Sequence, residues 1–326
     1  MSENNLPQPA PRPKPLARRV ARSVITFLLT PYLALTGIIT VFQRSLIYHP
    51  TPDRSLNERS RQLSQFHIEP LTVRTTDGST LNGWHIPADA DSKNVGETDT
   101  AQQRPTVLYF CGNAGHRAFR LMDFALLQQC QCNVVCFDYR GYGDNPGSPS
   151  EASLAADAQV IWKYLTGERG LPAHRIIIWG ESLGGGVATR LAAEASTAGT
   201  IPAGLVLRST FSSLTDAAAY HFPWLPVRLL LVDRFPSISR IPQVKCPILI
   251  VHGERDTIVP FRLGENLFAA APAKSANGVG KTLVRLPQAD HNDVLETSGA
   301  EVRRSFREFL DTLSARDAHA AAPADK

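Results

Sequence analysis

The sequence lacks an excess of charge of either sign once its first 22 residues are set aside. The chain of 326 residues holds 34 Lys and Arg against 30 Asp and Glu. Five of the basic residues and one acidic residue fall in residues 1–22, which leaves 29 of each sign in the rest. Because phosphate recognition needs a concentrated cationic surface, we expect no nucleic-acid binding by the main part of the chain.

Repetitive sequence is also absent. The chain has no glycine at every third position, no sustained heptad and no internal repeat, which excludes collagen, coiled-coil and solenoid architectures. Charged residues make up 20% and apolar residues 43%, a mixture too apolar for a disordered chain and typical of globular proteins. Length alone allows one large domain or two ordinary ones.

Cysteine is scarce, with five residues in all. Cys111, Cys136 and Cys246 lie in or beside apolar, strand-like runs, where buried free thiols are common. Cys130 and Cys132 lack a second cysteine pair or a histidine at metal spacing, so we expect no zinc site. An odd number of cysteines does not decide whether the compartment is oxidising.

A single long apolar run lies near the N-terminus. Residues 1–22 form a basic leader whose first part is rich in proline, and we predict that this leader is disordered. Residues 23–42 contain no charged side chain, and 20 such residues span the hydrocarbon core of a bilayer as a helix. The preferred interpretation is a transmembrane anchor; a cleaved signal peptide and a buried or surface-lying hydrophobic helix are the alternatives.

The basic residues on either side of this run give a weak signal for its orientation. Five Lys and Arg precede the run, and Arg44, Arg54, Arg59 and Arg61 follow it closely. The small excess before the run favours an N-terminus in the cytoplasm. We therefore expect a single-pass membrane protein with its main domain on the non-cytoplasmic side.

The body of the chain, residues 43–314, predicts one α/β domain. Residues 66–75 and 80–87 flank the turn signal Thr76-Asp77-Gly78-Ser79 and indicate a β-hairpin. Short apolar runs then alternate with amphipathic stretches of helical length. The predicted strands are 106–111, 133–138, 175–179, 204–208, 247–252 and 282–286, and the predicted helices are 116–130, 151–166, 183–197, 261–271 and 292–314. This alternation is typical of a mostly parallel sheet with helices on both faces.

Two segments depart from this alternation. Residues 211–240 break its rhythm and are predicted to form a small cap. Residues 315–326 are polar and alanine-rich, and we predict a disordered tail.

The segment Gly180-Glu181-Ser182-Leu183-Gly184 has the pattern G-x-S-x-G. It follows an apolar strand and opens a helix, which is the context of a nucleophile elbow. The turn is so tight that only glycine fits on both sides of the serine. We therefore predict that Ser182 is a nucleophile; a plain helix-capping serine is the alternative.

A serine nucleophile needs a base and an acid that orients the base. In folds with this elbow the chain order is serine, acid, histidine. His291 follows the last predicted strand and precedes the last helix, so we predict that it is the base. Asp256 follows the preceding strand and is the favoured acid, with Glu254 as the alternative. His252 ends that strand, where a structural role is expected.

The oxyanion hole needs backbone N–H groups beside the nucleophile. We expect one from Leu183, the residue after the serine. The other is expected from Asn113, in the glycine-bounded loop 112–115.

In several of its motifs the chain resembles the α/β-hydrolases, in particular the membrane-anchored α/β-hydrolase-domain serine hydrolases. The resemblance covers roughly residues 42–313 and rests on F-Q-R-S-L-I-Y-H-P at 42–50, F-C-G-N-A-G at 110–115, D-Y-R-G-Y-G at 138–143, P-S-E at 149–151, G-E-S-L-G-G at 180–185 and H-G-E-R-D-T-I-V-P at 252–260. It implies a Ser182–Asp256–His291 triad and esterase-type substrates, since related proteins are lysophospholipid or monoacylglycerol lipases and protein depalmitoylases. Cys111 replaces a usual histidine and Asn145 a usual serine; the first change bears on the assignment of Asn113.

These features predict a serine hydrolase that cleaves carboxylic esters or thioesters of lipids or acylated substrates near a membrane. Such a mechanism passes through an acyl-enzyme and needs no metal or organic cofactor. An amidase or peptidase with the same triad is one alternative. A non-catalytic membrane binding module with the same fold is the other.

Overall fold

The computed structural model describes residues 16–56, 58, 63, 66–88 and 104–321. The chain divides into two compact units, with the border between Gln43 and Arg44. Each unit is described by itself.

The first unit is helical. Helix α1 (Leu16–Val24), the π-helical turn η1 (Ile25–Leu29) and α2 (Thr30–Ile47) follow one another, and α2 ends in the second unit. Residues Leu16–Ile47 are long and apolar enough to cross a membrane, with a mean hydropathy of 2.0 in their most apolar window. The helix begins at Leu16, so the prediction of disorder was wrong for residues 16–22. The prolines end at Pro15, and the Leu, Ala and Arg residues that follow are strong helix formers; residues 1–15 lie outside the described part.

The second unit contains an eight-stranded sheet in the order β2-β3-β6-β4-β7-β8-β9-β10. The strands are β2 (Glu69–Arg74), β3 (Thr80–Ile86), β4 (Thr106–Phe110), β6 (Asn133–Phe137), β7 (Ile176–Glu181), β8 (Gly204–Arg208), β9 (Ile248–Gly253) and β10 (Thr282–Leu286). All neighbours are parallel except β3, which runs antiparallel to β2 and β6. The predicted hairpin and the mostly parallel sheet are confirmed. A second, two-stranded sheet of β1 (His49–Pro50) and β5 (Ala114–Gly115) was not predicted.

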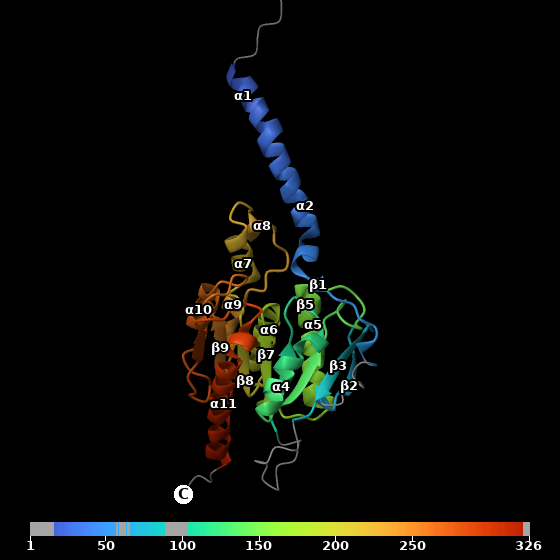
Figure 1. Cartoon of the computed structure of the whole chain (residues 1–326), viewed down its shortest axis with the longest axis vertical. Helices are drawn as coiled ribbons and strands as arrows, with labels where there is room; N and C mark the ends of the chain where they lie inside the picture. The colour runs from blue at the N-terminus through green and yellow to red at the C-terminus, as the bar shows by residue number, and fades with distance from the viewer. Residues whose placement is uncertain (1–15, 57, 59–62, 64–65, 89–103, 322–326) are drawn as a thin grey trace, which may run out of the picture. The chain divides into compact units, whose positions relative to one another are not determined.

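Helices cover both faces of the large sheet (Figure 1). Helices α4 (Leu121–Gln129) and α11 (Val294–Ala321) contact each other on one face, and α5 (Glu151–Lys163), α6 (Leu183–Thr197) and α10 (Phe261–Ala270) cover the other. The short helical turns are η4 (Arg117–Arg120), η5 (Tyr164–Glu168), η6 (Ala173–Arg175) and η7 (Ile241–Gln243). Helix α11 continues to Ala321, so the predicted tail was wrong for residues 315–321, where alanine and arginine favour helix.

The predicted cap, residues 211–240, consists of three short helices rather than a continuation of the sheet. These are α7 (Leu214–His221), α8 (Val227–Leu230) and α9 (Ser237–Arg240). The side chain of Ser213 caps α7 by accepting a hydrogen bond from the backbone N–H of Asp216 at 2.9 Å. Proline residues at 223, 226 and 236 separate the helices, because proline cannot continue a helix interior.

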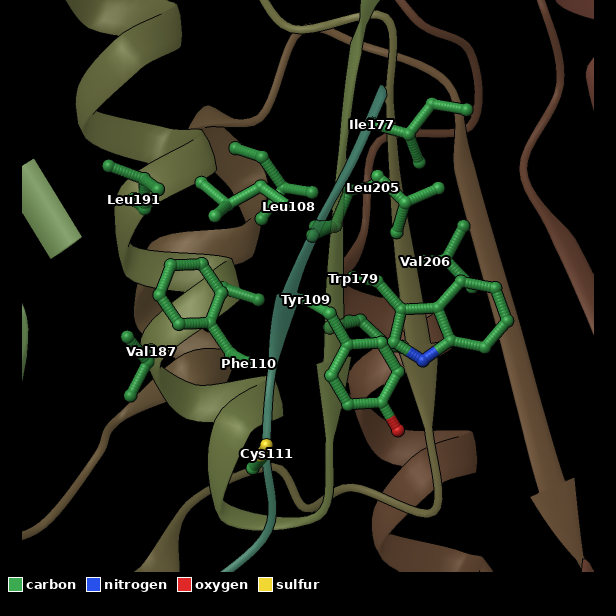
Figure 2. Packing of buried hydrophobic residues seen from close by; sticks show 14 of the residues in the cluster. Leu108, Tyr109, Phe110, Cys111, Ile177, Trp179, Val187, Leu191, Leu205 and Val206 are labelled. Atoms are coloured by element: carbon green, nitrogen blue, oxygen red, sulfur yellow. The ribbon is translucent and has the colours of Figure 1, made fainter. Parts of the chain in front are cut away.

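The central strands are buried on both faces, which explains their unbroken apolar sequences. Figure 2 shows Leu108 and Phe110 of β4 directed toward α6, whereas Tyr109 lies on the opposite side of the strand beside Trp179. The ring of Trp179 packs edge-on against Phe306 of α11, with centroids 5.1 Å apart. Helix α11 is therefore held on the sheet by an aromatic contact in the middle of the core.

We expect Phe306→Ala to lower the free energy of unfolding by about 3–5 kcal/mol, because Phe306 is fully buried and its removal leaves a cavity beside Trp179. Denaturant unfolding of the protein measures this loss. Arg304→Ala, on the exposed side of the same helix, is the control and should cost less than about 0.5 kcal/mol. Similar losses for both variants would contradict this account of the core.

Candidate active site

The sharp turn between β7 and α6 positions Ser182. Its backbone has φ 50° and ψ −117°, an unfavourable conformation for a residue with a side chain. A Cβ atom on Gly180 would collide with the backbone of Gly184, and one on Gly184 would collide with the carbonyl of Phe110. The N–H of Ser182 donates to the carbonyl of Arg208 at 2.9 Å. The glycines of the motif thus allow β7, α6 and β4 to meet closely enough to hold the serine in this turn.

The structure brings the three predicted residues Ser182, His291 and Asp256 together. The Oγ atom of Ser182 lies 3.0 Å from Nε2 of His291, and Nδ1 of His291 lies 2.7 Å from Oδ2 of Asp256. His291 follows β10, and its backbone N–H donates to Asp290 at 2.7 Å. Side chains from three separate loops therefore form one continuous hydrogen-bonded chain.

Asp256 is nearly inaccessible to solvent and is held by several donors. Its Oδ1 accepts hydrogen bonds from the backbone N–H groups of Ile258 at 3.0 Å and Val259 at 2.6 Å. Burial alone raises the pKa of this carboxyl, but hydrogen bonds from His252 and His291 outweigh burial and lower the pKa to about 2. Asp256 is therefore ionised at neutral pH, as an acid that stabilises an imidazolium must be.

The sequence predicted only a structural role for His252. In the structure, the imidazole of His252 contacts the carboxylate of Asp256. The ring is fully buried, and its Nε2 lies 2.8 Å from the carbonyl oxygen of Val259 and 3.2 Å from Oδ2 of Asp256. Because a carbonyl oxygen only accepts, Nε2 carries the proton. Gly264 leaves room for the ring, since a Cβ there would collide with Nδ1. The two residues are four apart in the sequence, at the end of β9 and in the loop after it, and this closeness was the one sign of a contact that the sequence offered.

Glu254, the alternative acid, lies elsewhere. Its carboxylate is 3.7 Å from the guanidinium of Arg285 on the neighbouring strand, and its side chain is more than a third exposed. The geometry thus joins Asp256, and not Glu254, to His291.

Of the two expected oxyanion-hole residues, Leu183 directly follows Ser182 and Asn113 lies in the loop 112–115. Leu183 is buried at the first position of α6. Asn113 is fixed by its side chain, whose Nδ2 donates to the carbonyl of Ile47 at 2.9 Å, and by its carbonyl, which accepts from the N–H of His49 at 3.0 Å. A Cβ on the preceding Gly112 would be 3.6 Å from Cβ of Ser182. The start of the loop 112–115 therefore lies beside Ser182.

A cluster of buried and partly buried charges next to Ser182 was not anticipated from the sequence. Arg120 pairs with Glu181 at 2.6 Å, and Arg208 pairs with Asp123 at 2.6 Å. The hydroxyl of Tyr109 lies 2.9 Å from Glu181 and 3.1 Å from Asp123. Burial raises the pKa of Glu181, but the two arginines and Tyr109 outweigh it and lower the pKa to about 2. The two cations and two anions offset the cost of burying each other's charge.

A pocket of about 400 Å³ opens over this cluster and His291. Arg120, Glu181 and Arg208 give it a polar wall, and its apolar lining includes Phe119, Met122 and Leu295. The pocket combines both kinds of surface within reach of the triad, which suits an amphiphilic molecule.

The five cysteines are buried and free. The Sγ atoms of Cys111 and Cys136 are 3.6 Å apart, and burial raises the pKa of the Cys132 thiol. In the part of the chain that the structure describes, no three His, Cys, Asp or Glu side chains are grouped to hold a metal ion.

Comparison with known proteins agrees with the fold. Residues 105–236 match a family described as having the alpha/beta hydrolase fold. An uncharacterised protein of Mycobacterium tuberculosis is 39% identical over 281 residues, which is 85% of this chain and 92% of that protein. The lysophosphatidylserine lipase ABHD12 of Danio rerio is 32% identical over 286 residues, or 79% of this chain and 74% of the relative. The chain belongs to the α/β-hydrolase family. Within it, ABHD12 lipases are among its relatives.

Solved structures show the same fold at lower sequence identity. An esterase of Pyrococcus furiosus superposes with a TM-score of 0.59 at 20% identity, covering 78% of this chain and 93% of the esterase. An α/β-hydrolase of Vibrio vulnificus gives a TM-score of 0.60 at 18% identity, covering 97% and 98%. The fold and the relatives together support a hydrolase.

We expect Asp256→Asn to lower the free energy of unfolding at pH 7 by about 2 kcal/mol. The pKa of Asp256 falls from 3.8 to about 2 on folding, so its ionisation stabilises the protein above pH 4, and this contribution is lost as the pH falls toward 2. Denaturant unfolding at several pH values measures the difference between variant and wild type. The difference should shrink below pH 4.

Asp311→Asn changes an exposed carboxylate on α11 and is the matched control, with an expected effect below about 0.5 kcal/mol. A difference between Asp256→Asn and wild type that stays constant from pH 7 to pH 2 would show that ionisation of Asp256 is not its source.

Proposed function

We propose that the protein is a serine hydrolase that cleaves carboxylic ester or thioester bonds of lipids or acylated substrates near a membrane. The observation that carries the proposal is the hydrogen-bonded chain Ser182–His291–Asp256, with links of 3.0 and 2.7 Å. The relationship to a lysophosphatidylserine lipase and the mixed polar and apolar pocket beside His291 support a lipid ester as the substrate class.

In the proposed mechanism, Ser182 Oγ attacks the carbonyl carbon while His291 Nε2 accepts the hydroxyl proton. Asp256 stabilises the resulting imidazolium through Nδ1–H. The tetrahedral oxyanion accepts hydrogen bonds from the N–H groups of Leu183 and Asn113. The imidazolium then protonates the leaving alcohol or thiol, and an acyl-enzyme remains on Ser182. Water activated by His291 attacks this ester, and its collapse releases the acid and restores the serine.

We further propose that the apolar helix Leu16–Ile47 anchors the enzyme in a membrane as a single pass, with the catalytic domain on the non-cytoplasmic side. Length and composition of the helix support the span, and the excess of basic residues before it supports the orientation. Such an anchor keeps the active site at a bilayer, where lipid esters are concentrated.

Ser182→Ala should abolish labelling of the full-length protein by a fluorophosphonate probe and reduce hydrolysis of p-nitrophenyl esters by more than about a thousandfold. The reason is that the probe and the ester both need the Ser182 hydroxyl. Gel fluorescence and a colorimetric assay measure the two effects. Ser209→Ala is a matched control, since Ser209 is also a buried serine with positive φ that follows the neighbouring strand β8. Labelling and turnover of Ser182→Ala at wild-type levels would refute the assignment.

His252→Leu should lower kcat/KM for p-nitrophenyl esters by about ten- to a hundredfold, mainly through kcat, because Asp256 loses one of the donors that orient it. His252→Gln retains an N–H donor near the position of Nε2 and should recover most of the rate. Steady-state kinetics measure both variants, with thermal unfolding as a check that each folds. Equal rates for the Leu and Gln variants would show that the hydrogen bond does not position Asp256.

A further inference from the structure

The cap exposes a set of large apolar side chains. We define the cap surface as the exposed residues Tyr220, Phe222, Trp224, Leu229 and Val232. Leu229 is 79% and Trp224 50% exposed, and helix α8 has no buried residue. The rings of Phe222 and Trp224 lie edge to face with centroids 6.4 Å apart. Clustered apolar exposure of this kind marks an interaction surface.

The cap is hydrogen-bonded to residues that follow the apolar run 23–42. Asp233, next to Val232, is buried and accepts hydrogen bonds from Nε of Arg44 at 3.0 Å and from the hydroxyl of Tyr48 at 3.1 Å. Arg44 is the second residue after that run. A buried carboxylate paired with Arg44 is costly to separate from it, so the cap surface stays close to the point where the chain leaves the apolar run.

Residues 47–50 of the same segment are also hydrogen-bonded to the loop 112–115 beside Ser182. The side chain of Asn113 binds the carbonyl of Ile47, and His49–Pro50 pairs with Ala114–Gly115 as a parallel bridge. Figure 1 shows α7, α8, β1 and β5 at one end of the second unit, the end where the loop 112–115 lies. Residues 44–50 thus connect the cap and the entrance to the site.

We propose that the cap surface lies in the interfacial region of the bilayer that the apolar helix crosses, and holds the entrance of the active site against the lipid. The inference rests on the proposed membrane anchor. Tyr220 and Trp224 have the amphipathic rings that settle at the level of lipid headgroups. Leu229 and Val232 supply apolar area for the acyl boundary. Beside them, Arg228 pairs with Asp216 at 3.0 Å and keeps most of its side chain exposed at the level of the headgroups. A lipid ester then reaches Ser182 from the bilayer rather than from water.

Tryptophan fluorescence gives a direct test, because Trp224 is the single exposed tryptophan of the four and Trp84, Trp162 and Trp179 are buried in the core. The full-length protein is reconstituted in phosphatidylcholine vesicles with and without bromine on the acyl chains near the headgroup. We expect bromolipid to quench the wild-type emission and to have little effect on Trp224→Phe. Equal emission in both kinds of vesicle, or equal quenching of both proteins, would overturn the proposal.

A second measurement separates the bilayer from a protein partner. In vesicles, acrylamide in the aqueous phase should quench the fluorescence of Trp224 only weakly. In a detergent with small micelles, which leaves the cap in water, the same acrylamide should quench it strongly. Protection from both acrylamide and bromolipid would show that another protein, such as a second copy of the chain, covers the surface, and would refute the lipid contact.

The functional consequence is tested with Leu229→Asp, which places a charge on the cap surface, and with Asn277→Asp, which adds the same charge at an exposed turn before β10. We expect Leu229→Asp to reduce bromolipid quenching and to lower hydrolysis of an ester carried in vesicles by about tenfold. Its hydrolysis of water-soluble p-nitrophenyl acetate should equal that of the wild type, and Asn277→Asp should match the wild type in all three assays. Unchanged vesicle hydrolysis and quenching in Leu229→Asp would contradict the proposal.

Failure of this inference is distinguishable from failure of the proposed function. Ser182→Ala should keep the bromolipid quenching, since the contact needs no catalysis. Quenching without any ester hydrolysis by the wild type would refute the proposed function and leave the lipid contact standing, whereas hydrolysis without quenching would refute the contact alone.

Discussion

The close approach of three backbones at the turn between β7 and α6 is the constraint on which the site depends. Gly184 packs against the carbonyl of Phe110 at the end of β4, and Gly185 packs against Thr210 after β8. No side chain fits at either glycine. The positive φ of Ser182 costs free energy, and this cost is offset because its N–H and carbonyl are both bonded, to Arg208 and Thr210. The neighbouring strands therefore fix where the serine hydroxyl lies.

Paired buried charges surround this turn. Asp256, Arg208 and Asp123 are buried, and Arg120 and Glu181 are partly buried at the wall of the pocket. An isolated charge removed from water in this way is very costly. Each carboxylate has cationic or N–H partners, so Asp256 and Glu181 remain ionised with pKa values of about 2. Fixed charges in a poorly solvated site interact strongly and need little rearrangement during a reaction. The same pairs that permit burial thus create the electrostatic environment of the pocket.

The segment from Arg44 to Pro50 connects the membrane-spanning candidate to this site. Arg44 binds the cap through Asp233, and Ile47 and His49 bind Asn113 on the loop beside Ser182. The last residues of α2, from Arg44 to Ile47, thereby share the hydrogen bonding of the second unit.

Local patterns in the sequence were enough to predict most of the secondary structure. The alternation of apolar runs and amphipathic stretches predicted the strands and helices. The glycines around Ser182 predicted its turn, because a side chain at Gly180 would collide with the backbone of Gly184 four residues later. The prediction of disorder was wrong for residues 16–22 and 315–321, which lie at the ends of helices. Both segments are polar overall, but many of their residues have a high helix propensity. Other contacts became visible only in the folded chain: Glu254 turns to Arg285, and Arg208 pairs with Asp123 beside Glu181. These two pairs join residues far apart in the sequence, so no local pattern reveals them. His252 and Asp256 are only four residues apart, but their contact depends on how the loop after β9 turns back on its strand, and this turn leaves no periodic signal in the sequence.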